Sequence, residues 1–434
     1  MTDKLRSSIS RYARHEIRFP DAIGSQANIS INQDRGHKMA NTKDVVIVGA
    51  ARTAIGTFGG ALKDFSAGDL GAIAVKEAFA RAKVDPAQAG QIVFGNVIHC
   101  EPRDMYVSRV VGINAGMAKE SAALTLNRLC GSGLQAIVTA ANAIQLGDTD
   151  IAIGGGVETM SRAPYSTSVA RWGQRMGDFK MIDMMVGALS DPFGAGHMGI
   201  TAENVAEKYG ISREEQDAFA LESQKKAVAA IAAGHFKSQI VPVEVKGRKG
   251  VTLFDTDEHP KADTTLESLA KLKPAFKKEG GTVTAGNASG LNDGAAACVL
   301  MEAGAAAKAG LQPLARLVSY AVAGVEPSIM GTGPIPAVQL ALKRAGLSLN
   351  DMDVIESNEA FAAQSLGVCK GLDLDPARTN PNGGAIALGH PLGASGAIIT
   401  VKCLYELIRT NKRYGLITMC IGGGQGIAAI IERI

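Results

Sequence analysis

One cysteine stands in the stretch Asn127-Arg128-Leu129-Cys130-Gly131-Ser132-Gly133-Leu134-Gln135, between a short apolar run and a helical pattern. The apolar run, Leu124-Thr125-Leu126, predicts a strand, and the alanine-rich pattern over 134–146 predicts a helix. A strand, a tight turn and a helix put Cys130 at a helix N-terminus, where exposed N–H groups and the helix dipole favour a thiolate over a thiol. Taken alone, this pattern fits a reactive cysteine and a buried structural cysteine equally well.

Composition excludes several classes of protein. The chain has 434 residues, of which 46% are hydrophobic, so it can bury one large core or two to three modest ones. The formal net charge of +3 gives no global attraction for nucleic acid, and no apolar run reaches the length needed to span a membrane. We therefore expect neither nucleic acid nor a membrane as a partner.

The cysteines and histidines predict a reducing compartment and no metal site. Six cysteines without a Cys-x-x-Cys pair do not form a disulfide framework, so we expect a cytoplasmic protein with free thiols. The seven histidines are scattered, and no pair has the spacing of metal ligands. No Walker or dinucleotide-binding glycine fingerprint follows a strand, so no nucleotide cofactor is expected either.

Helices and buried strands alternate along most of the chain, which predicts an α/β fold with a mixed, largely parallel sheet between helices. Residues 39–160 plus 291–312 form the expected N-terminal core half, and residues 313–434 form the C-terminal half. Residues 161–290 mix loops with short helical patterns and are interpreted as an inserted loop domain. Residues 1–38 are interpreted as a mobile extension before a conventional start at Met39; a mitochondrial presequence is the less favoured interpretation because the segment carries acidic residues.

The two halves have parallel layouts. In the first, Cys130 precedes a glycine-containing turn, a helical pattern and the strand-like run IAIGGG (151–156). In the second, His390 precedes a glycine-containing turn, a helical pattern and the run MCIGGG (419–424). This layout predicts a duplicated βα domain whose helix N-termini meet across a pseudo-twofold axis, so that both residues face one cleft.

Four segments in this order resemble the thiolase family, in particular its bacterial biosynthetic-type β-ketothiolases (acetyl-CoA acetyltransferases). They are NRLCGSG (127–133), SNEAF (357–361), GHPLGASG (389–396) and CIGGGQG (420–426). The resemblance extends over residues 44–434. It implies a five-layer αβαβα fold of duplicated core domains, acyl-CoA substrates without a further cofactor, and a homotetramer built as a dimer of dimers. It also implies a role in fatty acid metabolism or polyhydroxyalkanoate biosynthesis.

The expected reaction is the reversible Claisen condensation of two acetyl-CoA, or of acetyl-CoA with a short acyl-CoA, to 3-ketoacyl-CoA and free CoA. One group must hold an acyl unit covalently, and a second must move a proton at the α-carbon. The resemblance assigns the acyl-enzyme to Cys130, the base that takes its proton to His390, and proton transfer at carbon to Cys420. It further assigns oxyanion stabilisation to the backbone N–H of Cys130 and Gly422, and to His390 with a water held by Asn358.

The resemblance places the binding site for the CoA part of the substrate in the inserted region. Thiolases hold the pantetheine arm of CoA through loop residues, and Met330 is expected to line the acyl end. Lys261 is the basic residue singled out for the CoA phosphates. The full set of expected substrate-binding residues is Leu189, His197, Met198, Lys261, Phe276, Ser289 and Met330.

Two other functions are considered. A decarboxylating ketoacyl synthase on the same fold needs one cysteine and generates its carbanion by losing CO₂, so Cys420 argues against it. A non-enzymatic protein, either a thiolase-like lipid carrier or a redox-responsive scaffold, would require degraded catalytic positions. A related hypothesis is that Cys130 and Cys420 lie in one cleft, where oxidation joins them reversibly and switches the enzyme off. Because every proposed catalytic position is occupied by a suitable residue type, the acyltransferase is the favoured prediction.

Overall fold

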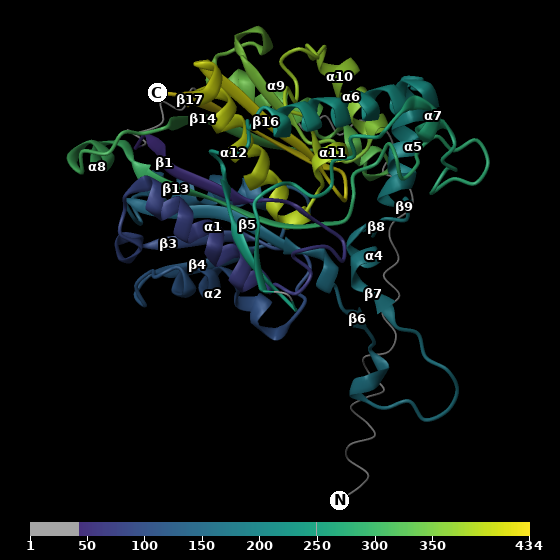
Figure 1. The fold of residues 1–434 in the computed structure, drawn as a ribbon, viewed down its shortest axis with the longest axis horizontal. Coiled ribbons are helices and arrows are strands. Elements are labelled where there is room, and N and C mark those ends of the chain that lie inside the picture. Colours follow the sequence, from purple (N-terminus) through teal and green to yellow (C-terminus); the bar gives the residue numbers. More distant parts are fainter. Residues whose placement is uncertain (1–42, 249) are drawn as a thin grey trace, which may run out of the picture. The chain divides into compact units, whose positions relative to one another are not determined.

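The structure is a computed structural model that describes residues 43–248 and 250–434, and the expected extension over 1–38 lies outside these ranges. Two homologous halves are formed by residues before and after position 313, with an excursion between β5 and β13 (Figure 1). The N-terminal half contains β1 (Val45–Thr53), β2 (Gly56–Thr57), α1 (Ala67–Ala82), η2 (Pro86–Gln88), β3 (Gln91–Gly95), η3 (Pro102–Tyr106), α2 (Val107–Asn114), β4 (Ala122–Leu126), α3 (Ser132–Leu146), β5 (Ile151–Thr159), β13 (Asn292–Glu302) and α8 (Ala303–Lys308).

The C-terminal half and the excursion complete the fold. The C-terminal half contains β14 (Ala315–Gly324), η6 (Pro327–Thr332), α9 (Pro334–Ala345), η7 (Leu349–Asp351), β15 (Val354–Ser357), α10 (Ala362–Leu372), α11 (Ala385–Leu388), α12 (Leu392–Thr410), β16 (Tyr414–Ile421) and β17 (Gln425–Arg433). The excursion contains η4 (Met160–Arg162), β6 (Tyr165–Ser166), η5 (Val169–Arg171), β7 (Ile182–Asp183), α4 (Met184–Ala188), β8 (Ser190–Asp191), β9 (Gly196–His197), α5 (Met198–Tyr209), α6 (Arg213–Ala232), β10 (Ile240–Val241), β11 (Val243–Gly247), β12 (Gly250–Phe254) and α7 (Leu266–Ala270).

Strand order confirms the predicted duplication. The N-terminal half has the order β4-β3-β5-β13-β1, and the C-terminal half has β15-β16-β17-β14. An isolated parallel bridge from Ile355 in β15 to Thr379 occupies the position that β4 holds beside β3. The two halves are joined edge to edge where Val46 and Ile47 of β1 pair with β14. In this correspondence α3 matches α12, so the turns of Cys130 and His390 occupy equivalent places.

The sheet is mixed, as predicted, but the prediction that it is largely parallel is wrong. Parallel pairing joins β3 to β4 and β5, β15 to β16, and β1 to the short β10. The remaining ladders are antiparallel, because β13 returns beside β5 after the excursion and β17 forms a hairpin with β16. The hairpin turn contains Gly423 and Gly424 at φ +79° and +83°. Only a left-handed backbone closes this turn, which favours glycine.

Three cores separate five layers, as predicted for this fold. One core lies between the outer helix α1 and the N-terminal strands, with Leu70, Val75 and Phe79 packed on them. A second lies between α9 and the C-terminal strands. The third and largest core surrounds α3 and α12, which pack against each other; α3 also contacts β3 and β5, and α12 contacts β5, β13 and β16. The strands β1, β5, β13, β16 and β17 therefore bury both faces, which explains their continuous apolar sequences.

The two central helices touch backbone to backbone. A Cβ on Gly133 of α3 would lie 2.6 Å from the backbone nitrogen of Ala397 in α12. A Cβ on Gly396 of α12 would lie 2.3 Å from the backbone nitrogen of Leu134 in α3. Both distances are shorter than any side chain tolerates, so this contact requires glycine on each helix. The helices that begin directly after Cys130 and His390 are thereby held against each other.

Local capping agrees with the sequence patterns. Ser66 caps α1 by accepting a hydrogen bond from the Asp69 N–H, and Ser212 and Glu215 form a capping box at the start of α6. These bonds satisfy N–H groups that a helix leaves free in its first turn. No helix among the described residues has the length and apolar character needed to cross a membrane.

Candidate active site

The turn before α3 has a strained backbone that is held by side chains. Leu129 has φ +44°, a left-handed conformation that is uncommon for a large residue. Ser132 Oγ accepts a 2.8 Å hydrogen bond from the Arg128 N–H and donates a 2.6 Å bond to the Leu129 carbonyl. Asn127 Oδ1 accepts a 2.9 Å bond from the Leu129 N–H. Such strain is found at sites where the surrounding structure fixes a reactive group, and the residue fixed here is Cys130.

Burial raises the pKa of the Cys130 thiol to about 11. The backbone N–H groups of Gly422, in the turn after β16, and of Cys130 itself lower this pKa, but their effect is smaller. The N–H groups thus favour the thiolate, as expected, but they do not outweigh burial. Desolvation of the charged form outweighs the helix dipole in this pocket, and Cys130 needs a base.

His390 lies opposite Cys130 and is held on both of its ring nitrogens. The Nδ1 atom lies 2.6 Å from Ser395 Oγ, and Nε2 lies 3.5 Å from Asn358 Nδ2. The backbone N–H of His390 donates a 2.9 Å hydrogen bond to Asn292 Oδ1. Burial lowers the pKa of His390 to about 4. The imidazole is consequently neutral at physiological pH and able to accept a proton.

Cys420 lies behind the wall of the pocket and does not line it. Its side chain is fully buried and packs with Met198, Met330 and Phe361, which do line the pocket. Burial raises the pKa of Cys420, and the charge of a Cys130 thiolate would raise it further. Cys420 is therefore a protonated thiol within electrostatic reach of Cys130. A substrate reaches it only if these neighbouring side chains yield.

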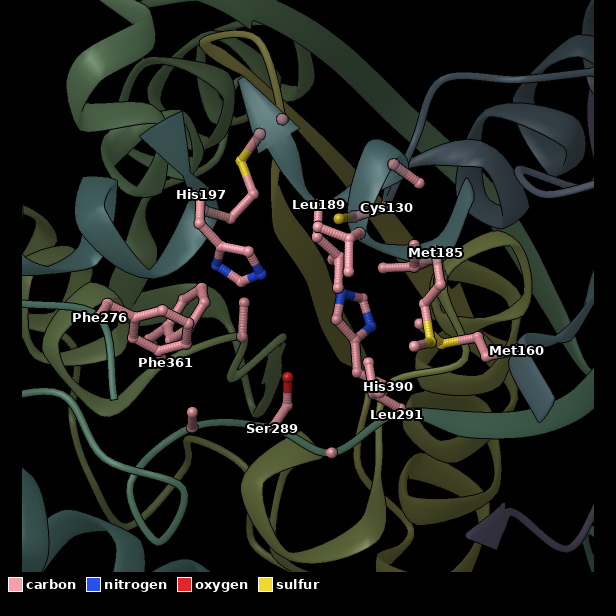
Figure 2. Close-up of a pocket in the computed structure, with 18 of the residues that line it drawn as sticks. Cys130, Met160, Met185, Leu189, His197, Phe276, Ser289, Leu291, Phe361 and His390 are labelled. Atoms are coloured by element: carbon pink, nitrogen blue, oxygen red, sulfur yellow. The ribbon is translucent and has the colours of Figure 1, made fainter. Parts of the chain in front are cut away.

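One pocket of about 360 Å³ brings together most of the expected residues. Figure 2 shows the Cys130 sulfur and the His390 ring facing the same cavity, with Phe276 and Phe361 on one side of the ring and Met160 and Met185 on the other. The expected residues that line it are Cys130, Leu189, His197, Met198, Phe276, Ser289, Met330, His390 and Gly422. The pocket walls are mainly apolar, a character that suits an acyl chain and a pantetheine arm.

Besides Cys420, two expected residues lie outside this pocket. Asn358 is buried beside His390 and lines a small neighbouring cavity together with Ser395. Lys261 lines a third cavity with His259 and Gln224, which adjoins the main pocket at Ala285. Lys261 therefore lies beside the main pocket and does not line it. Among residues 43–248 and 250–434, no cluster of three or more His, Cys, Asp or Glu side chains is arranged to hold a metal ion.

An aromatic wall forms one side of the pocket. The rings of His197 and Phe276 stack with centroids 4.7 Å apart, and Phe361 meets Phe276 edge to face at 6.2 Å. The stack fits only because Gly199 carries no side chain, since a Cβ there would lie 2.2 Å from the Phe276 ring. The wall joins the excursion to the SNEAF segment of the C-terminal half, so both contribute to one surface.

Glu158 is a residue of the site that the sequence analysis missed. It is fully buried at the end of β5, and its carboxylate accepts four hydrogen bonds. The donors are Asn96 Nδ2, the Val97 N–H and the Ile98 N–H at 3.1 Å, and the Gly393 N–H at 2.7 Å. The one available signal was an acidic residue at the end of a buried apolar run, which is costly unless the charge is satisfied.

Comparison with known proteins identifies the family of this chain. The profile of the thiolase N-terminal domain matches residues 45–304, and that of the thiolase C-terminal domain matches residues 311–433. Beta-ketothiolase BktB of Cupriavidus necator is 64% identical over 393 residues, which cover 91% of this chain and 100% of that relative.

Solved structures agree as well. The Bacillus anthracis acetyl-CoA acetyltransferase superposes with a TM-score of 0.88 at 47% identity, covering 91% of this chain and 99% of that one. Human mitochondrial 3-ketoacyl-CoA thiolase in complex with CoA superposes with a TM-score of 0.87 at 48% identity, covering 90% and 98%. On the matched domains, the identity and the shared fold, this chain belongs to the thiolase family.

Proposed function

We propose that the protein is a β-ketothiolase, an acetyl-CoA C-acetyltransferase that joins two acetyl-CoA, or acetyl-CoA and a short acyl-CoA, and reverses this reaction. The observation that carries the proposal is the shared pocket of Cys130, His390 and Gly422, with Cys420 directly behind its wall. The names of the relatives, beta-ketothiolase and acetyl-CoA acetyltransferase, support the same reaction.

The first half-reaction of thiolysis uses Cys130 and His390. The Cys130 sulfur attacks the 3-keto carbon of a 3-ketoacyl-CoA while the thiol proton passes to His390 Nε2. The backbone N–H groups of Cys130 and Gly422, which lower the pKa of the Cys130 thiol, are the donors expected to stabilise the negative oxygen on the carbon bonded to that sulfur. Each preorganised donor of this kind is worth about 10²–10³ in rate. Breaking the C2–C3 bond leaves an acyl-cysteine and the enolate of acetyl-CoA.

The second cysteine completes the reaction at carbon. The Cys420 thiol donates its proton to C2 of the enolate, which releases acetyl-CoA; His390 and a water held by Asn358 stabilise the enolate oxygen. The thiol of an incoming CoA then gives its proton to the Cys420 thiolate and attacks the acyl-cysteine carbonyl. The C–S bond to Cys130 breaks, which releases the shortened acyl-CoA, and the Cys130 sulfur takes back its proton from His390. Condensation follows the same steps in reverse. A protonated Cys420 is the form that thiolysis requires, which agrees with its raised pKa.

Steady-state thiolysis of acetoacetyl-CoA, 3-ketovaleryl-CoA and 3-ketohexanoyl-CoA tests the function and its substrate range. We expect activity on acetoacetyl-CoA and on at least one longer substrate, because flexible methionines line the acyl side of the pocket. Absence of thiolysis with all three substrates would refute the proposal. CoA is the substrate and no further cofactor is required. The expected CoA contacts are Leu189, His197, Met198, Phe276 and Ser289 around the arm, with Lys261 nearer the phosphates.

The alternatives are not favoured. A decarboxylating synthase has no use for Cys420, and turnover of malonyl thioesters in place of acetyl-CoA would be needed to support it. A purely redox-responsive role leaves His390, Asn358 and the pocket without a purpose. We further propose a homotetramer, a cytoplasmic location and a role in short-chain fatty acid metabolism or polyhydroxyalkanoate biosynthesis, for which the molecular mass in solution is the first measurement.

A further inference from the structure

We infer that Ser395 is a positioning residue, which holds the His390 proton on Nδ1 so that Nε2 presents its lone pair to Cys130. The inference rests on the proposed function, since it concerns the base of that reaction. Ser395 belongs to the GHPLGASG segment and lies in the first turn of α12, five residues after His390. Its hydroxyl is the one hydrogen-bond partner of Nδ1 among the described residues, at 2.6 Å.

The hydroxyl of Ser395 has one proton and two possible acceptors, His390 Nδ1 and the Pro391 carbonyl. Ser395 Oγ donates a 2.8 Å hydrogen bond to the Pro391 carbonyl, one helical turn earlier. A serine hydroxyl that has given its only proton to a carbonyl can only accept from the imidazole. Nδ1 must then carry the hydrogen of the neutral ring. Both side chains are buried, at 4% and 2% exposure, so water does not replace either bond.

The opposite tautomer would remove the base from the pocket. In that arrangement Ser395 would donate to Nδ1, and Nε2 would carry a hydrogen where Cys130 needs an acceptor. Asn358 Nδ2 lies 3.5 Å from Nε2, which is long for a hydrogen bond, so the tautomer is set by the short contact on Nδ1. In the same way, the partner of one ring nitrogen sets the state of the other in many histidine sites.

The position of Ser395 is fixed by the first turn of α12. The Gly393 N–H donates a 2.7 Å hydrogen bond to Glu158, and a Cβ on Gly393 would lie 2.8 Å from that carboxylate. Asn292 holds the His390 backbone N–H from β13 at 2.9 Å. Asn292 therefore fixes the backbone of His390, and Glu158 fixes the helix turn that carries Ser395. Together these two hydrogen bonds set the short distance between His390 Nδ1 and Ser395 Oγ. Imidazolium formed when Cys130 gives up its proton keeps the same Nδ1–H bond.

Proton placement can be read directly by neutron diffraction from deuterated crystals of the resting enzyme. We expect deuterium on His390 Nδ1, an unprotonated Nε2, and the Ser395 deuteron directed at the Pro391 carbonyl. Deuterium on Nε2, with the Ser395 deuteron directed at Nδ1, would overturn the inference. This measurement does not depend on turnover. If the protein proved to have no thiolase activity, the proposed function would be refuted, but the His390 tautomer could still be determined by neutron diffraction.

Kinetics provide the second test, with a matched control on the same helix. Thr400 also donates to the carbonyl one turn earlier, with Oγ1 2.7 Å from the Gly396 oxygen, and it is buried at 1% exposure without contacting His390. We expect Ser395→Ala to lower kcat for acetoacetyl-CoA thiolysis about 10²-fold with little change in KM, which is at the lower end of what a positioned base contributes. Ser395→Thr should recover most of this loss, and Thr400→Val should keep wild-type kcat.

Two kinetic outcomes would overturn the inference. One is a wild-type kcat in Ser395→Ala. The other is an equal loss in Thr400→Val, which would assign the effect to packing of α12. If Ser395→Ala does not fold, the neutron result alone decides between the two tautomers.

Discussion

Glu158 at the end of β5 accepts a 2.7 Å hydrogen bond from the Gly393 N–H at the start of α12. This bond joins the N-terminal half to the C-terminal half three residues after His390. The same carboxylate holds the Val97 and Ile98 N–H groups in the segment after β3. One buried side chain therefore fixes both the start of the helix that carries His390 and a segment of the N-terminal half.

Glu158→Gln should destabilise the fold by at least about 2 kcal/mol, because an amide presents N–H groups to donors and each buried donor left without an acceptor costs about 1–3 kcal/mol. Urea unfolding measures the change. Glu302→Gln is the control: Glu302 accepts the Gly304 and Ala305 N–H groups at a half-exposed site, where water takes over. Equal stability of Glu158→Gln and the wild type would contradict this role of the carboxylate.

Removing either catalytic sulfur should separate the two half-reactions. Cys130→Ala should abolish thiolysis and condensation while the fold is retained. Cys420→Ala should still acquire an acyl group from acetyl-CoA, visible by intact mass spectrometry, but should not condense it, because no group exchanges the α-proton. Persistent thiolysis in Cys130→Ala would exclude it as the nucleophile.

Alkylation of Cys130 should depend steeply on pH. Burial raises the pKa of this thiol to about 11, so the thiolate fraction grows tenfold per pH unit up to that value. The rate of carbamidomethylation by iodoacetamide, followed at Cys130 by peptide mass spectrometry, should still be rising at pH 9. A plateau near pH 7 would show a preformed thiolate. Cys420 should react more slowly still, since its side chain is fully buried.

The pair formed by Arg52 and Asp257 should matter for stability without touching the chemistry. Arg52 donates to both Asp257 oxygens at 2.7 and 2.9 Å, and both side chains are fully buried. Arg52→Met should cost about 3–5 kcal/mol in urea unfolding, because it leaves an uncompensated buried carboxylate. Lys43→Met, which removes the exposed pair with Asp150, should change stability by no more than about 1 kcal/mol. Similar effects of both substitutions would argue against the role of burial.

Mild peroxide should inactivate the enzyme slowly, if at all. A disulfide between Cys130 and Cys420 requires one of them as a thiolate, and burial raises the pKa of both. If such a bond forms, dithiothreitol should restore wild-type activity, and intact mass spectrometry should show the loss of two hydrogens in the oxidised wild type but not in oxidised Cys420→Ala. Irreversible loss of wild-type activity would indicate overoxidation of Cys130 and no switch.

Much of the fold and of the site could be predicted because short sequence motifs determine the turns that hold the catalytic residues. The segments NRLCGSG and GHPLGASG contain the turns that precede α3 and α12, and Cys130 and His390 lie at equivalent places of a duplicated unit. The antiparallel return of β17 was missed because the Gly422-Gly423-Gly424 turn resembles the end of a strand, and only pairing with β16 identifies Gln425–Arg433 as the partner strand.

The remaining errors concern relationships between distant residues. The resting state of Cys130 depends on how deeply the other half buries it, which no local pattern encodes. Ser395 stood inside a recognised segment, yet its importance depends on the 2.6 Å approach to His390. Glu158 was passed over because its four donors come from segments up to 235 residues away. Polar contacts of this range are set by tertiary packing.

The reciprocal contact of Gly133 and Gly396 has a consequence for redesigning this enzyme. The two helices touch through main-chain atoms, so no side chain at this contact can rearrange to change the distance between Cys130 and His390. One methyl group added at Gly133 or Gly396 would push the helices, and with them the nucleophile and the base, apart. Variation in acyl length has to be sought in the methionine-lined perimeter, where soft side chains can rearrange. The reacting centre itself tolerates no such remodelling.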